Sequence, residues 1–220
     1  MKKLKIPSNL TTLAYNSIKE YILEGNLDDT SRLTEDFLSG RLGISKSPIR
    51  EALNRLEAEG LIRIEPRKGA FLRGATPQEI GHLYSLREAL EVHAVRTAEL
   101  TPALLQELRR SVRLQRALLK ANDKSHYIEE DIRFHAQMAL ATGNPYLCAA
   151  LENVQNQIWL TRRSTYSLSG STAPDFHEAI VEALERNDRD KAQQIMREHI
   201  ATVRQRLMQF LDHDRAPKSA

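Results

Sequence analysis

The most constraining feature of the sequence is a pair of short helices separated by a glycine turn, between residues 34 and 59. The first, TEDFLSGRL, begins at Thr34, a residue type that caps helix N-termini. The segment GIS at 43–45 indicates a tight turn. In the second helix Ile49 and Leu53 recur on one inward face, and Gly60 follows as a stop signal. This order predicts a helix-turn-helix.

A hairpin is predicted directly after the second helix. Ile62 and Ile64 alternate with charged residues, which is the period of a half-buried strand. PRKG at 66–69 supplies a turn, and residues 70–73 form the return strand. With a further helix predicted over 11–25, the N-terminal part of the chain is expected to fold as a winged helix-turn-helix.

The rest of the chain shows helical periodicity, broken by Pro, Gly and Asn-Asp segments, and no strand pattern. Thr76 can cap a helix that Pro77 starts, so the boundary is placed here. The prediction is a mainly α chain with two domains. Residues 1–75 form the winged helix-turn-helix, and residues 76–220 form about six helices in an all-α antiparallel bundle.

Charge is unevenly distributed along the chain. The formal net charge is +3, and residues 1–75 account for all of it, with 13 Lys or Arg against 10 Asp or Glu. This favours a polyanionic partner for the N-terminal domain, although a solvated surface with chance asymmetry is the alternative. The single cysteine rules out an intrachain disulfide, and no apolar run is long enough to span a membrane. A cytoplasmic protein without a membrane partner is expected.

The N-terminal residues of the second helix are the predicted DNA contacts. Lys46 and Arg50 lie four apart and share a face opposite the apolar stripe, with Ser45 and Ser47 beside them. Arginine pairs bidentately with guanine, whereas lysine and serine suit phosphate oxygens as well. At the tip of the wing, Arg67 and Lys68 are expected to meet phosphate or the minor groove. Each cation alone is more often a solubilising residue; together they indicate double-stranded DNA.

The stretch RLTEDFLSGRLGISKSPIREALNRLEAEGLIRIEPRKGAFL resembles the DNA-binding domain of the GntR transcription regulators. The resemblance extends over residues 10–73. The resemblance implies a homodimer that reads a palindromic operator. Lys46 stands where arginine is commoner in that family, which keeps the charge but weakens the case for bidentate guanine readout. Many members carry a basic residue near Asp36, so this acid is not expected to contact DNA.

Acids and histidines stand out in the C-terminal domain. Asp131 and His135 are four apart on one predicted helix, and His177 and His199 lie on later ones. Imidazole nitrogens with one carboxylate suit Zn, Ni, Mn or Fe, and the four-residue spacing presents two ligands to one ion. The alternative is a surface hydrogen bond or salt bridge, with His199 covering the core.

The segments DIRFHAQMALATGNPYL and DFHEAIVEALERNDRDKAQQIMREHI resemble the FCD ligand-binding domain of FadR-type GntR regulators, with a match over residues 78–210. The resemblance implies that Asp131 and the three histidines hold a divalent transition metal that shapes the site of a small carboxylate effector. Arg87 is the predicted contact for that carboxylate. The alternative for Arg87 is a surface ion pair with Glu88 or Glu91.

The leading hypothesis is therefore a ligand-responsive transcription regulator, by default a repressor released by its effector, and not an enzyme. A metallohydrolase could use three histidines and an aspartate, but the sequence has no H-E-x-x-H motif to supply a general base. The third hypothesis is an architectural DNA-binding protein whose C-terminal bundle has a purely structural role.

Overall fold

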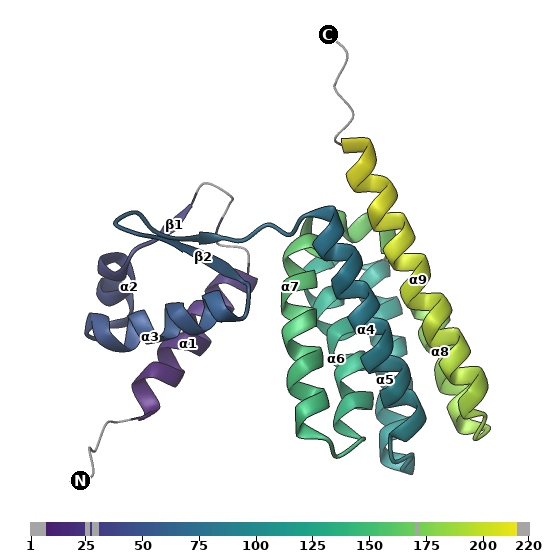
Figure 1. The fold of residues 1–220 in the computed structure, drawn as a ribbon. Helices are drawn as coiled ribbons and strands as arrows, with labels where there is room; N and C mark the ends of the chain where they lie inside the picture. The colour runs from purple at the N-terminus through teal and green to yellow at the C-terminus, as the bar shows by residue number, and fades with distance from the viewer. Residues whose placement is uncertain (1–7, 25–26, 28–30, 170–171, 215–220) are drawn as a thin grey trace. The chain divides into compact units, whose positions relative to one another are not determined.

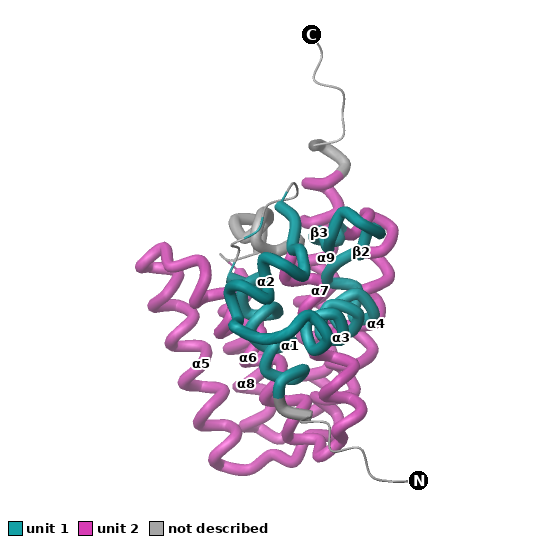
Figure 2. The backbone as a smooth tube through the Cα atoms, turned by 90° about the vertical axis from the view of Figure 1, so that its left-hand side faces the viewer, with its two compact units in different colours: residues 1–74 teal, residues 75–220 magenta. Residues whose placement is uncertain are grey.

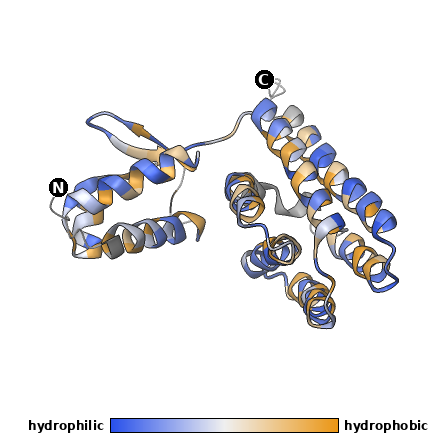
Figure 3. Cartoon of the chain, turned by 60° about the horizontal axis from the view of Figure 1, so that its bottom comes forward, coloured by the Kyte–Doolittle hydropathy of each residue, from blue (hydrophilic) through white to orange (hydrophobic). Residues whose placement is uncertain are grey.

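The fold is described from a computed structural model that places residues 8–24, 27, 31–169 and 172–214, with side chains for 10–24, 27, 31–160 and 172–211. Contacts divide the chain into two compact units, Met1–Gly74 (unit 1) and Ala75–Ala220 (unit 2), drawn in different colours in Figure 2. In both units the helices alternate hydrophobic and hydrophilic residues along their length, as amphipathic helices do (Figure 3).

Unit 1 is a small helical domain with one sheet (Figure 1). Its elements are α1 (Ser8–Leu23), β1 (Arg32–Leu33), α2 (Glu35–Leu42), α3 (Lys46–Ala58), β2 (Ile62–Glu65) and β3 (Gly69–Leu72). Helix α1 packs against α3, and their buried side chains include Ile18, Ile22, Ile49 and Leu56. The hydroxyl of Tyr15 donates a hydrogen bond of 2.6 Å to Glu59, which ties α1 to the end of α3. The predicted mainly helical fold with an N-terminal winged helix-turn-helix is confirmed.

The turn between α2 and α3 depends on Gly43. This residue adopts a left-handed φ of 66°, and its N–H donates to the carbonyl oxygen of Ser39 at 2.9 Å. Glycine takes this conformation without the steric penalty of a Cβ. The hydroxyl of Ser39 also donates to the carbonyl oxygen of Ile44 at 2.7 Å. The angle at which α3 leaves α2 is therefore fixed by both residues.

The wing is the hairpin of β2 and β3, and β1 adds an antiparallel third strand, in the order β1-β3-β2. The sequence did not predict β1, which has only two residues. Gly69 allows the strands to approach, because a Cβ at this position would lie 2.8 Å from the carbonyl oxygen of Leu33. At the tip, Pro66 and a left-handed Arg67 (φ 65°) form a turn that the N–H of Lys68 closes onto Glu65 at 3.0 Å.

Unit 2 contains six helices in its described residues and is all-helical, as predicted. They are α4 (Pro77–Thr97), α5 (Pro102–Lys120), α6 (Lys124–Leu140), α7 (Pro145–Ser169), α8 (Ala173–Glu185) and α9 (Arg189–Asp214). Thr76 caps α4 in a capping box with Glu79, as its sequence indicates. Helix α4 packs against α9, and α5 lies between α6 and α8. Within the described ranges, no helix has the length and hydropathy that a membrane crossing requires.

Candidate metal centre and DNA-binding surface

The four predicted metal ligands meet inside unit 2. Asp131 and His135 come from α6, His177 from α8 and His199 from α9, and all four side chains are buried. The Nε2 atoms of His177 and His199 are 3.3 Å apart. The carboxylate of Asp131 lies 3.8 Å from Nε2 of His177 and 3.9 Å from Nε2 of His135. One ring nitrogen from each histidine falls within 4.8 Å of the others, so the three imidazoles form a single cluster.

Two further buried side chains set which nitrogen of each ring faces the cluster. Nδ1 of His177 lies 2.7 Å from Oε1 of Gln115 on α5, and Nδ1 of His135 lies 2.5 Å from Oε2 of Glu91 on α4. Because Oε1 of Gln115 is an acceptor, Nδ1 of His177 carries the proton, which leaves the lone pair on Nε2. The negative charge of Glu91 favours a proton on Nδ1 of His135 in the same way, although this close pair lacks hydrogen-bond geometry. Phe134 stacks on His177 with ring centroids 4.1 Å apart and holds its plane. These contacts orient the nitrogens as metal ligands require.

The geometry fits a bound divalent transition metal. Two nitrogens at about 2.1 Å from one ion with a tetrahedral angle are about 3.4 Å apart, close to the separation of His177 Nε2 and His199 Nε2. Two lone pairs at this distance repel unless a proton or a metal ion lies between them. Nε2 of His135 is buried without a hydrogen-bond partner. Such a nitrogen is costly in a dry interior and would be satisfied by coordination.

Burial also keeps the imidazoles of His177 and His199 neutral. Burial, and after it the charge of His135, lowers the pKa of His177 to about 3. Burial and the nearby histidines lower the pKa of His199 well below its ordinary value of 6.5. Both rings are therefore neutral at pH 7, with one N–H each, and a metal ion would not have to displace a second proton from either of them.

Arg87, the predicted effector contact, is buried next to this cluster with only 1% of its surface exposed. Its Nε donates a hydrogen bond of 2.6 Å to Glu91, one of the two partners named in the alternative prediction of an ion pair. The surface location that this alternative predicted for the pair is wrong, because both side chains are buried. Burial alone raises the pKa of Glu91, yet the charge of Arg87 and the contact with His135 lower it to about 2. Glu91 thus links the buried guanidinium to a candidate metal ligand.

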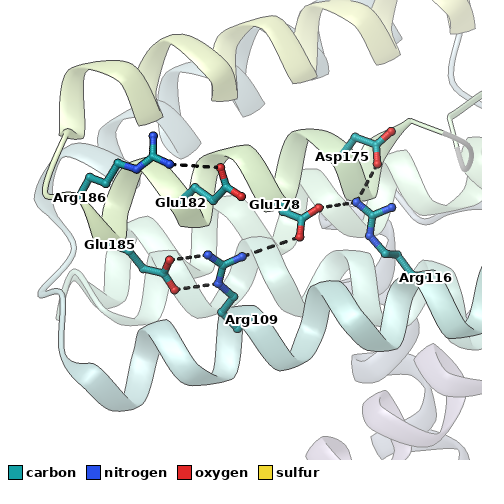
Figure 4. Close-up of polar contacts among 7 residues, drawn as sticks. All are labelled: Arg109, Arg116, Asp175, Glu178, Glu182, Glu185 and Arg186. Atoms are coloured by element: carbon teal, nitrogen blue, oxygen red, sulfur yellow. Dashed lines mark hydrogen bonds and ion pairs between the residues drawn. The ribbon is translucent and has the colours of Figure 1, made fainter.

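A ladder of ion pairs crosses the interface of α5 and α8, the helices that carry Gln115 and His177 (Figure 4). Arg109 reaches both carboxylate oxygens of Glu185, at 2.8 and 2.5 Å. Arg116, adjacent to Gln115 in the chain, reaches Asp175 at 2.8 Å and Glu178 at 2.6 Å on either side of His177. Each exposed pair is weak alone. Together they hold the two helices in the register that brings Gln115 to His177.

The six predicted DNA contacts are all exposed in unit 1. Ser45 precedes the first residue of α3, Lys46, Ser47 and Arg50 lie in its first two turns, and Arg67 and Lys68 lie at the wing tip. A groove of about 450 Å³ runs between α2, α3 and the wing. Arg50, Arg67 and Lys68 all line it. Helix and wing cations therefore border one hollow.

Sequence reasoning missed the ion pairs that hold two of these cations. Arg50 donates two hydrogen bonds to Glu35, from Nε at 2.8 Å and from Nη2 at 2.7 Å. Lys46 lies 2.5 Å from Asp36. Both acids stand in the first turn of α2. Gln115 was missed as well, and Glu91 was predicted as a possible partner of Arg87 but not as a neighbour of His135. An isolated polar residue in a helix carries no signal of its own in a single sequence.

Two family profiles match the chain. The profile of the family "Bacterial regulatory proteins, gntR family" matches residues 10–72, and the profile of the FCD domain matches residues 82–202. The second match covers more than half of the chain. It contains all four candidate metal ligands and Arg87.

The relatives are named as transcription regulators. The uncharacterised HTH-type transcriptional regulator YdhC of Bacillus subtilis is 27% identical over 206 residues, which is 90% of each chain. The gluconate operon transcriptional repressor of Bacillus licheniformis is 27% identical over 178 residues, covering 77% of this chain and 73% of its own.

Solved structures share the fold. McbR/YncC of Escherichia coli superposes with a TM-score of 0.79 at 22% identity, covering 94% of this chain and 99% of its own. A GntR regulator of Rhodococcus sp. RHA1 gives a TM-score of 0.77 at 20% identity, with coverage of 90% and 97%. The chain belongs to the GntR family of DNA-binding bacterial transcription regulators and carries an FCD domain in its C-terminal part.

Proposed function

We propose that this regulator is a ligand-responsive repressor. It binds a palindromic operator as a homodimer and senses a small organic acid through a divalent metal ion held in unit 2. The observation that carries the proposal is the buried convergence of His135, His177 and His199 around Asp131. A structural core has no need of three mutually facing imidazoles, whereas a metal-dependent sensor does.

DNA is read by the start of α3 and the wing. Ser45, Lys46, Ser47 and Arg50 are exposed on the N-terminal turns of α3, the part of a recognition helix that reaches base edges in the major groove. Arg50 is the candidate for guanine O6 and N7, and Lys46 for a base or phosphate. Arg67 and Lys68 project from the wing toward phosphate or the minor groove.

A homodimer follows from the size of this surface. One recognition helix with a wing contacts only a few base pairs, so specific binding needs a second copy on a half-site about one helical turn away. Two-fold symmetry in the protein then requires a palindromic operator. Repression is proposed because several relatives are repressors, among them the gluconate operon repressor.

The buried charges support a carboxylate effector. Arg87 contributes one positive charge, and Glu91 and Asp131, when ionised, contribute two negative charges, so these three buried groups sum to −1. Glu130, which is also buried, is paired separately with Arg133 at 2.7 Å. A divalent cation bound to Asp131 and the three histidines changes the balance to +1, and one carboxylate restores neutrality. Low-dielectric interiors favour such neutral sets. The metal would supply a Lewis-acid anchor for an anionic oxygen.

The residues around the site have two proposed roles, metal binding and contact with the effector. Asp131, His135, His177 and His199 would hold the ion, and Arg87 can offer a charge-assisted donor to a carboxylate. Because the ligands come from α6, α8 and α9, an effector that binds here contacts three helices of the bundle at once. Effector binding would favour the conformers of the dimer that fit the operator poorly.

The test is operator release by small acids. A fluorescent duplex selected by the protein from a randomised pool is bound by metal-loaded protein, and a panel of two- to six-carbon carboxylic acids is titrated in. We expect at least one acid to lower operator affinity several-fold in the wild type and to have no effect on the His177→Ala/His199→Ala variant. An acid panel that leaves operator binding unchanged, with metal confirmed present, would contradict the sensor proposal.

A further inference from the structure

We propose that Asp36, assisted by Glu35, is a specificity-determining residue of the DNA-binding surface. By holding cations of α3 in ion pairs, the two acids suppress binding to DNA of arbitrary sequence. The inference rests on the proposed role of α3 as the recognition helix. Glu35 and Asp36 are acids, so their charge alone would not identify them as part of a DNA-binding surface.

The first observation is the pairing itself. Lys46 and Arg50 are the only Lys or Arg residues in α3 before Arg55, and each lies against a carboxylate of α2. Asp36 is 82% exposed and Lys46 50% exposed, so their contact is made at the surface that DNA would approach. Glu35 is more protected and grips Arg50 through two parallel hydrogen bonds. The two acids therefore act differently.

The second observation is the charge of the groove between α2, α3 and the wing. Its charged lining residues are three cations, Arg50, Arg67 and Lys68, and three acids, Glu35, Asp36 and Glu65. Lys68 is itself 3.0 Å from Glu65. The lining carries no net formal charge, although it lies where a polyanion is expected to bind. A surface built only for affinity would leave Arg50 and Lys68 unpaired.

The consequence follows from how the two kinds of DNA binding depend on charge. Binding to arbitrary sequence comes almost entirely from phosphate neutralisation, so a carboxylate beside each cation weakens it directly. An exposed ion pair is cheap to break, so Lys46 can still exchange Asp36 for a correctly placed base or phosphate. Arg50 need not leave Glu35 to present its remaining N–H donors in a fixed orientation. Affinity for the wrong sequence falls more than affinity for the right one.

The experiment compares wild type with Asp36→Asn on two duplexes of equal length. One is selected by the wild-type protein from a randomised pool, and the other is its scrambled sequence. We expect Asp36→Asn to bind the scrambled duplex several-fold more tightly, with a slope of log affinity against log salt steeper by roughly 0.9, the value for one added phosphate contact. The ratio of specific to non-specific affinity falls.

Two matched variants make the result specific to this contact. Glu20→Gln removes one negative charge from an exposed position on α1, in the same unit, and is expected to change the salt slope much less. Adding Lys46→Ala to Asp36→Asn should remove most of the gain, because the freed lysine is its source. Circular dichroism confirms that the variants retain the helical fold.

Three results would overturn the inference. An unchanged ratio would show that Asp36 has no role in discrimination. Weaker binding of the selected duplex by Asp36→Asn would show that Asp36 contacts a base itself. An equal gain with Glu20→Gln would show an effect of net charge alone. Arg50→Ala is the separate control on the proposed function: if it binds the selected duplex as wild type does, α3 is not the recognition helix, whatever Asp36→Asn does.

Discussion

Replacing Glu91 by Gln should destabilise unit 2 far more than removal of an exposed acid. The substitution keeps the shape of the side chain but removes its charge, which leaves Arg87 buried with an uncompensated positive charge. Only one oxygen remains to accept from both Arg87 and Nδ1 of His135, so one donor must face the amide NH₂ group. Breaking a buried pair in this way costs about 3–5 kcal/mol.

Urea unfolding of chelator-treated protein measures this cost. Trp159 is the single tryptophan of the chain and is buried in α7, so its fluorescence reports on unit 2. A loss of about 3–5 kcal/mol lowers the urea midpoint by roughly 1–3 M. The matched control is Glu182→Gln, which breaks another Arg–Glu pair of four-residue spacing, with Arg186 on the surface. Its expected cost is about 0–1 kcal/mol.

The result that would refute this reasoning is a Glu91→Gln midpoint that falls no further than that of Glu182→Gln. It would mean that water or a rearranged Arg87 satisfies the charge. The buried charge balance used to argue for a carboxylate effector would then fail as well.

Three further predictions concern single side chains. Arg50→Ala should abolish discrimination between a selected and a scrambled duplex without changing the helical signal; equal discrimination in an anisotropy assay would contradict the assignment of α3. Arg67→Gly should not lower stability, since glycine accepts the left-handed φ of 65° at the wing tip. It should reduce the slope of log DNA affinity against log salt by roughly one. A clear loss of stability or an unchanged slope would argue against a phosphate contact. Gln115→Leu should weaken metal binding about 10–100-fold by removing the acceptor for Nδ1 of His177, as measured by competition with a chelating dye; wild-type affinity would show that the ring needs no such partner.

The fold was largely predictable because its elements are strongly patterned. Ile49 and Leu53 mark the inward face of α3, Ile62 and Ile64 mark β2, and the break at residues 74–77 precedes the capped helix α4. β1 was not predictable, because two residues cannot display a period. Its existence depends on β3 passing close to Leu33, which is a tertiary property.

The candidate site was predictable in its ligands but not in its surroundings. Asp131 and His135 share a helix, so their spacing carries information. His177 and His199 were noted on later helices, and the resemblance to the FCD domain assigned all four residues to one site. Glu91 faces His135 from another helix, and no spacing within one helix predicts such a contact. The ion pairs of α2 with α3 were missed for the same reason, since packing between helices decides which charges meet.

Metal content tests the central claim most directly. The protein is purified without a polyhistidine tag from metal-replete cells and analysed for Zn, Ni, Mn and Fe, beside the His177→Ala/His199→Ala variant. The account predicts close to one divalent transition metal ion per wild-type chain, little in the variant, and a melting temperature of the wild type that falls on chelation. A wild-type protein that contains no metal and melts identically with and without added ions would contradict it.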